Sequence, residues 1–167
     1  MTDLAEGIDW TGTSEDMVRE VLAQGEAFLQ AQFQSALAAD QRATTLASIL
    51  VTISVAVFAG ALAVWESVPD DALYAVSTIA AVLLLAAASA AWAARPIDFW
   101  YPGMRPEQWY DGRNEKLVDM LGGASEDVQF RIDENETLMG GNQTAIRISF
   151  VLAILSPIIG FIVWRAL

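Results

Sequence analysis

Residues 44–65 read TTLASILVTISVAVFAGALAVW, a run from Thr44 to Trp65 without one charged side chain. A helix rises about 1.5 Å per residue, so the run is long enough to cross a hydrocarbon core of about 30 Å. Lipid offers no partner to backbone N–H and C=O groups, and a helix satisfies these groups within the segment itself. The stretch therefore predicts a transmembrane helix, the first span.

A stripe of small side chains runs along this predicted helix, because Ser48, Thr52, Ala56 and Gly60 recur at every fourth residue. Small side chains let a second helix backbone approach closely in lipid. We expect the stripe either to pack against another helix or to line a water-filled gap of an oligomer with its two hydroxyl groups. In the alternative interpretation, the hydroxyl groups bond back to carbonyls of their own helix and the stripe only packs.

Two further apolar runs, 72–94 and 146–165, predict a second and a third span. The turn at 66–71 joins the first two spans and contains Pro69 followed by two carboxylates, which is typical of a helix start. The second span is also rich in small residues, so a close hairpin with the first span is the simplest packing. Pro157 is expected to kink the third span.

The polar residues before the first span also carry a helical pattern. Residues 1–13 are interpreted as an acidic tail, and Thr13 with Asp16 fits a capping box that starts a helix. Apolar residues then recur at helical spacing through 14–43 without a proline. This pattern predicts one nearly continuous helix that runs on into the first span.

The polar residues between the second and third spans, 95–145, predict an interfacial loop and further helices. A short helix at 107–121 is expected to end at Gly122-Gly123. Ser125 is expected to cap a new helix that continues into the third span. The fold class that follows is an all-α integral membrane protein, with three transmembrane helices and long amphipathic cytosolic extensions.

Composition excludes several classes of function. The net charge is −12, and such an acidic chain repels nucleic-acid phosphates, so we expect no nucleic-acid polymer as a partner. The chain has no His and no Cys, which excludes Ser–His triads, thiolate chemistry and zinc sites built from imidazole or thiolate. No group of residues suggests catalysis, so neither an enzymatic activity nor a cofactor is expected.

Three basic residues outside the spans, Arg113, Lys116 and Arg131, are candidate ligand-binding residues that could gather an anion. Interleaved acids make ion pairs between residues four apart the simpler expectation. A cluster of acids in the same segment could hold a divalent cation, and consists of Asp133, Glu134 and Glu136. A solvated acidic helix face is favoured, because this spacing matches no loop of oxygen ligands, and no metal site is expected.

Aromatic residues gather after the second span, at 99–101, with Trp92 before them and Trp109-Tyr110 after them. Amphipathic rings favour the depth of the membrane–water interface, so an interfacial belt is the simpler interpretation. A platform that stacks a base or another flat ligand is the alternative.

Short motifs around the spans resemble a group of small bacterial defence proteins. These motifs are Ala39-Asp40-Gln41-Arg42-Ala43 before the first span, Ala94-Arg95-Pro96 followed by Phe99-Trp100-Tyr101 after the second, and the helix 128–144 that leads into the third. The group comprises the SLATT and Pycsar-type transmembrane effectors of antiphage systems that signal with cyclic nucleotides. Asn142-Gln143-Thr144 stands where that pattern has a lysine, so no nucleotide contact is assigned.

The resemblance implies a membrane protein that oligomerises and, when triggered, permeabilises or disrupts the inner membrane. The partners that it implies are the lipid bilayer, further copies of the chain, and a trigger that is either a cyclic nucleotide or a partner protein. The competing expectation is a non-catalytic structural or accessory subunit of a larger membrane complex.

Basic residues also predict an orientation. Eight of the nine Lys and Arg residues fall in 1–43 or 95–147, and only Arg165 lies at the other end of the third span. By the positive-inside rule, the N-terminus is expected in the cytoplasm and the C-terminus outside a bacterial inner membrane.

Overall fold

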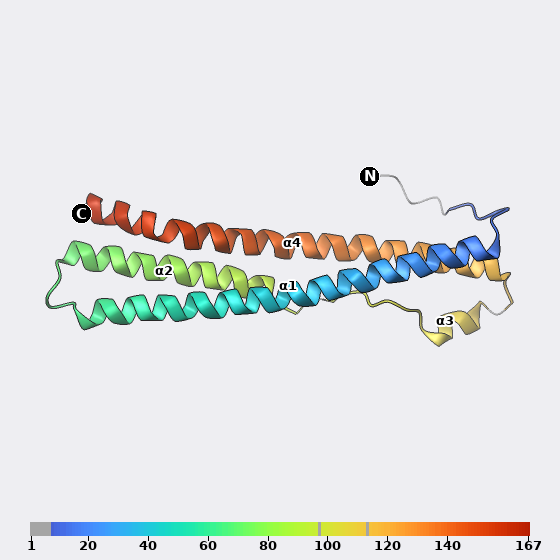
Figure 1. Cartoon of the computed structure of the whole chain (residues 1–167), viewed down its shortest axis with the longest axis horizontal. Coiled ribbons are helices and arrows are strands. Elements are labelled where there is room, and N and C mark those ends of the chain that lie inside the picture. The colour runs from blue at the N-terminus through green and yellow to red at the C-terminus, as the bar shows by residue number, and fades with distance from the viewer. Residues whose placement is uncertain (1–7, 97, 113) are drawn as a thin grey trace. The chain divides into compact units, whose positions relative to one another are not determined.

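The computed structural model describes residues 8–96, 98–112 and 114–167, and in these ranges the chain is helical without a strand. Four helices follow one another along the chain (Figure 1): α1 (Glu15–Ala63), α2 (Asp70–Ala93), α3 (Pro106–Asp111) and α4 (Leu117–Ala166). Three of them, α1, α2 and α4, are long and apolar enough to cross a membrane. The all-helical class and the three candidate spans that the sequence predicts are thus confirmed.

Helix α1 is a single element of 49 residues, as its uninterrupted periodicity predicts. Its first residue differs slightly from the expectation, because Ser14 and not Thr13 is the N-cap. The N–H of Met17 donates to Oγ of Ser14 at 3.3 Å, whereas the N–H of Thr13 is held in the preceding turn by the carbonyl of Trp10 at 3.0 Å. The predicted capping box is therefore wrong, because the third residue after the N-cap Ser14 is Met17, which has no side-chain acceptor for it.

Helix α2 begins as expected, with Pro69 at the N-cap and Asp70 and Asp71 in the first turn. Its carboxylates lie near the positive end of the helix dipole. No side chain caps the helix, and the N–H groups of Ala72 and Leu73 donate to the carbonyl of Pro69 instead.

Helix α4 corrects the prediction that Gly122-Gly123 ends one helix and Ser125 caps another. Both glycines lie inside α4, and the Oγ of Ser125 donates to the carbonyl of Leu121, one turn back in the same helix. The reason is a contact distant in sequence: a Cβ at Gly122 would collide with the indole ring of Trp10. Glu126 holds that ring through a 3.1 Å bond to its Nε1–H.

The chain divides into two compact units. We call residues 1–36 and 97–138 the polar unit, and residues 37–96 and 139–167 the apolar unit. Helices α1 and α4 each contribute their first part to the polar unit and their second part to the apolar unit.

The core of the polar unit lies between the first parts of α1 and α4. Its buried apolar residues are Val18, Leu22 and Leu29 of α1 and Leu121, Ala124, Val128 and Ile132 of α4. The two helices run parallel here, because Gly25 faces Val128 and, further along both helices, Gln32 faces Ile132. The Nε2–H of Gln32 donates to the carbonyl of Ile132 at 3.3 Å, which places a polar group inside the seam.

In the apolar unit, α2 packs against both α1 and α4. Its buried face consists of Leu83 and the alanines 75, 80, 86, 87, 90 and 93. The hydroxyl of Ser54 on α1 donates to the carbonyl of Ala80 at 2.7 Å, so the predicted hairpin between the first two spans is present. On α4, a Cβ at Gly160 would collide with Ile79, which shows a close approach of the two backbones.

Candidate functional site

The most elaborate polar site of the described residues is a strap that lies along the polar unit. The strap, residues 98–105, follows α2 and precedes α3 without helical structure of its own. Two of its rings pack against Phe33 of α1, with centroid distances of 6.1 Å to Phe99 and 5.2 Å to Tyr101. The aromatic cluster that the sequence shows at 99–101 therefore packs in part on this helix.

Asn135 of α4 binds the middle of the strap at two points. Its Oδ1 accepts the backbone N–H of Trp100 at 3.0 Å, and its Nδ2–H donates to the carbonyl of Trp100 at 3.2 Å. Asn135 is 0% exposed, so loss of either bond would leave one of its buried polar groups without a partner, which is costly. Glu134, the preceding residue, accepts the indole N–H of Trp100 at 2.7 Å.

Arg131 binds the next part of the strap from one helical turn earlier. Its Nη1–H group donates to the carbonyls of Tyr101 at 3.3 Å and Gly103 at 3.0 Å, and its Nη2 lies 2.6 Å from Asp127. The guanidinium also lies 5.6 Å from the ring centre of Trp100, and the residue is only 9% exposed. Arg131 is therefore a structural cross-link whose charge is balanced by Asp127.

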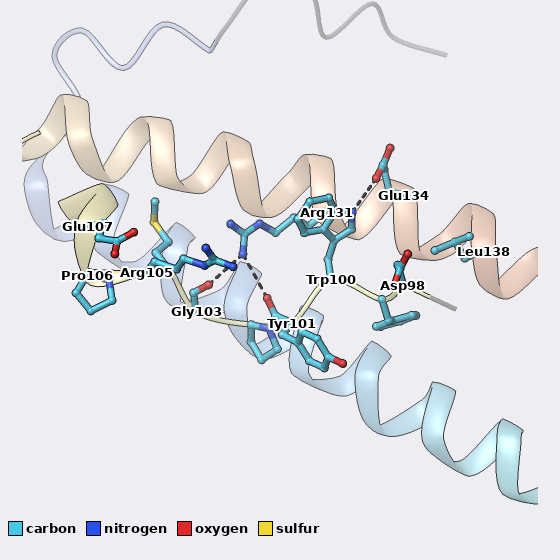
Figure 2. Close-up of a pocket in the computed structure, with 13 residues that line it drawn as sticks. Asp98, Trp100, Tyr101, Gly103, Arg105, Pro106, Glu107, Arg131, Glu134 and Leu138 are labelled. Atoms are coloured by element: carbon cyan, nitrogen blue, oxygen red, sulfur yellow. Dashed lines mark hydrogen bonds between the residues drawn. The ribbon is translucent and has the colours of Figure 1, made fainter. Parts of the chain in front are cut away.

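A pocket of about 1090 Å³ opens between the strap and α4 (Figure 2). Its charged lining residues are Asp98, Arg105, Glu107, Arg131 and Glu134. Three carboxylates and two guanidinium groups thus line the pocket, and the guanidinium group of Arg131 is paired with Asp127. The pocket consequently has no excess of positive charge with which to attract a phosphate group.

Of the three basic residues considered as an anion site, the two that the structure describes, Lys116 and Arg131, lie far apart. Arg131 is occupied as described above, with the i,i+4 ion pair that the sequence favours. Lys116 is exposed just before the first residue of α4, fifteen positions earlier and hence about 22 Å away along the helix axis. Arg113 lies outside the described residues. Lys116 and Arg131 therefore cannot bind one small anion together.

The acidic cluster at 133–136 behaves as a helix face. Asp133, Glu134 and Glu136 are exposed, and Asp133 accepts a bond from Gln129 at 2.8 Å. Among the residues that the structure describes, no three acidic side chains lie close enough to hold a metal ion.

The small-residue stripe of the first span points away from the rest of its own chain. Ser48, Thr52, Ala56 and Gly60 are all exposed, and nothing lies within 4 Å of a Cβ built at Gly60. The hydroxyl of Ser48 donates to the carbonyl of Thr44, and that of Thr52 to the carbonyl of Ser48, both at 2.9 Å. Within one chain the hydroxyl groups therefore bond back to their own helix, and the stripe stays exposed.

Sequence reasoning missed the polar groups inside the apolar unit. Besides Ser54, the hydroxyl of Ser89 on α2 donates to the carbonyl of Ala145 on α4 at 2.8 Å. Ser149 is 0% exposed, and its hydroxyl has no hydrogen-bond partner among the described residues. A helical serine ordinarily donates to the carbonyl four residues earlier, which for Ser149 is that of Ala145. The hydroxyl of Ser89 already donates to this carbonyl.

A second detail concerns Pro157, which lies within α4 without ending it. A proline has no N–H to donate to the carbonyl four residues earlier, here that of Ala153. The hydroxyl of Ser156 donates to this carbonyl at 2.9 Å and replaces the missing bond. The dipeptide Ser156-Pro157 thus lets an apolar helix contain a proline.

No protein family, no curated protein and no solved structure matches this chain.

Proposed function

We propose that the protein is an integral membrane effector, which oligomerises and permeabilises the bacterial inner membrane when its polar unit receives a signal. The observation that carries this proposal is the continuity of α1 and α4, each of which passes from the polar unit into the apolar unit as one helix. In this proposal, a change in the packing of the polar seam reaches the spans along these two helices. Neither a cofactor nor a catalytic step is part of the proposal.

The proposed orientation follows the distribution of basic residues. Arg42, Arg95 and Arg147 lie beside the ends of the three candidate spans on one side, and Arg165 alone lies on the other. By the positive-inside rule, the polar unit is cytoplasmic and Leu167 is outside. A reporter that is active only in the cytoplasm is expected to be inactive when fused after Leu167, and activity there would contradict this orientation.

The proposed assembly uses the stripe of Ser48, Thr52, Ala56 and Gly60. In lipid, an exposed face of small residues favours close helix contact, and a Cβ at Gly60 would meet no atom within 4 Å in the described chain. Between copies, the hydroxyl groups of Ser48 and Thr52 could face water in place of lipid. They would then line a water-filled gap between copies that needs no charged residue.

A structural accessory subunit is the second candidate. It is favoured by apolar side chains that remain exposed in the polar unit, such as Phe28 and Phe130, where contact with lipid would not explain them. In that case the spans anchor the chain and a larger complex covers the polar unit.

The decisive experiment follows membrane potential in cells that express the chain. Expression with its neighbouring genes and under phage challenge is expected to depolarise the cells. One arm supplies a cyclic nucleotide and another supplies only the partner protein, so the two arms separate the two kinds of trigger. Changing Gly140 and Gly141 together to Ala should blunt depolarisation, because alanine stiffens the helix and both positions have room for a Cβ. Gly123→Ala, also in α4 and also open, is the matched control. An unchanged potential in every arm would leave the accessory subunit as the better proposal.

A further inference from the structure

One face of α1 in the polar unit carries apolar side chains that the described residues leave exposed. Met17, Val21 and Phe28 lie four and seven residues apart, so they share one side of the helix, with the exposed Gln24 between Val21 and Phe28. All three are exposed, Phe28 at 50%. They lie beside the buried seam that faces α4, whereas Phe33, which carries the strap, lies about 140° around the helix axis from them. We call this set of three residues the apolar face of α1.

The charge of the unit that carries this face is strongly negative. Residues 1–36 and 97–138 contain 17 Asp and Glu residues against five Lys and Arg, which gives −12. The remaining residues contain four of each sign, so the entire net charge of the chain belongs to the polar unit. Beside the apolar face, Glu20 is exposed, and it is linked to Gln24 by a 2.8 Å bond.

These two observations select one kind of occupant. A second copy that docked on this face through its own polar unit would bring another charge of −12 against the first. The acids of the polar unit would likewise be repelled by an anionic leaflet. A basic amphipathic helix satisfies both requirements, because its apolar side meets residues at helical spacing while its Lys and Arg meet the surrounding acids.

We infer that the apolar face of α1 is the docking site for a basic amphipathic helical segment of a partner protein. Val21 and Phe28 are the anchors of the contact, since residues seven apart stand on the same line of the helix. The acids of the polar unit provide attraction and orientation. The inference concerns the polar unit alone and does not depend on whether the spans permeabilise a membrane.

The test measures peptide binding to the full chain in mild detergent by fluorescence anisotropy. The probe is a labelled helical peptide of about 18 residues made of Leu and Lys, with all Leu on one face. A second peptide of the same composition, with Leu scattered around the helix, reports attraction by charge alone. The one-faced peptide is expected to bind at least about tenfold more tightly than the scattered one.

Two variants locate the contact. The double substitution Val21→Ser and Phe28→Ser is expected to weaken binding of the one-faced peptide by about tenfold or more. Phe130→Ser is the matched control, because Phe130 is 54% exposed in the same unit but lies about 200° around α4 from the buried Val128. Phe130→Ser should leave binding unchanged. Circular dichroism checks that both proteins keep their helix content, which is expected because the replaced side chains are exposed.

Three results would overturn the inference. Equal binding of the two peptides would show that charge alone attracts them. An equal loss with Phe130→Ser would show that the contact lies elsewhere. Native mass spectrometry in which the Val21/Phe28 double variant alone changes an oligomer into monomers would show that a second copy covers the face.

Discussion

At the scale of single residues, adjacent glycines of α4 have different roles. A Cβ at Gly122 would meet the ring of Trp10, whereas nothing lies within 4 Å of one at Gly123. Gly123→Ala should therefore raise the free energy of unfolding by up to about 1 kcal/mol, the ordinary gain of alanine in a helix. Gly122→Ala should lower it by about 1–3 kcal/mol, because Trp10 must leave its site. Thermal unfolding followed by circular dichroism compares the two, and equal effects would contradict the assigned contact.

The same glycines show what the sequence could not predict. A Gly-Gly pair after a helical run ordinarily indicates the end of a helix. Here a glycine is needed at 122 to make room for the indole ring of Trp10, which lies more than a hundred residues earlier in the chain. Arg131 is a similar case, because its ion pair with Asp127 is local and predictable. Its bonds to the carbonyls of Tyr101 and Gly103 depend on the path of the strap, which has no periodic signal.

At the scale of elements, Asn135 determines whether the strap stays on α4. Asn135→Ala removes both bonds to the backbone of Trp100 and leaves its N–H and C=O unpaired. Hydrogen exchange at the Trp100 amide should accelerate by about tenfold or more, since each lost bond costs about 1 kcal/mol. Glu134→Gln is the control, because it keeps an acceptor for the indole N–H and does not contact the backbone of Trp100. Unchanged exchange in Asn135→Ala would exclude the two-point contact.

The sequence of α1 contains a second pattern, a seven-residue repeat, that indicates which face of the helix packs. The buried residues Leu22, Leu29, Ala43 and Leu50 lie at multiples of seven residues, and Ser54 with Ala61 continues a seven-residue repeat. Such a repeat is typical of a helix that packs along its neighbours. The four-residue repeat of small side chains in the same segment marks a different face, which is exposed. The presence of the span was predictable from hydropathy, whereas the choice between these two faces required the position of α2.

At the scale of the whole molecule, two glycines in the spans separate folding of one chain from association of several. Gly160 on α4 lies against Ile79 and the carbonyl of Ala75, so Gly160→Leu must push two helices of one chain apart. Gly60 on α1 faces open space, so Gly60→Leu leaves the contacts within the chain intact. If copies associate through the stripe that contains Gly60, the added side chain separates them by its own width and weakens the oligomer.

Both variants should therefore be measured for stability and for mass. Gly160→Leu is expected to lower the midpoint of thermal unfolding, because overpacking of a filled contact costs about 1–3 kcal/mol. Gly60→Leu should leave that midpoint close to that of the unchanged chain and shift native mass spectra in mild detergent toward monomer. A Gly60→Leu protein that keeps the oligomer of the unchanged chain at every concentration would remove the stripe from the proposed assembly. The association would then have to use another exposed face, since the fold of the single chain does not depend on a side chain at this position.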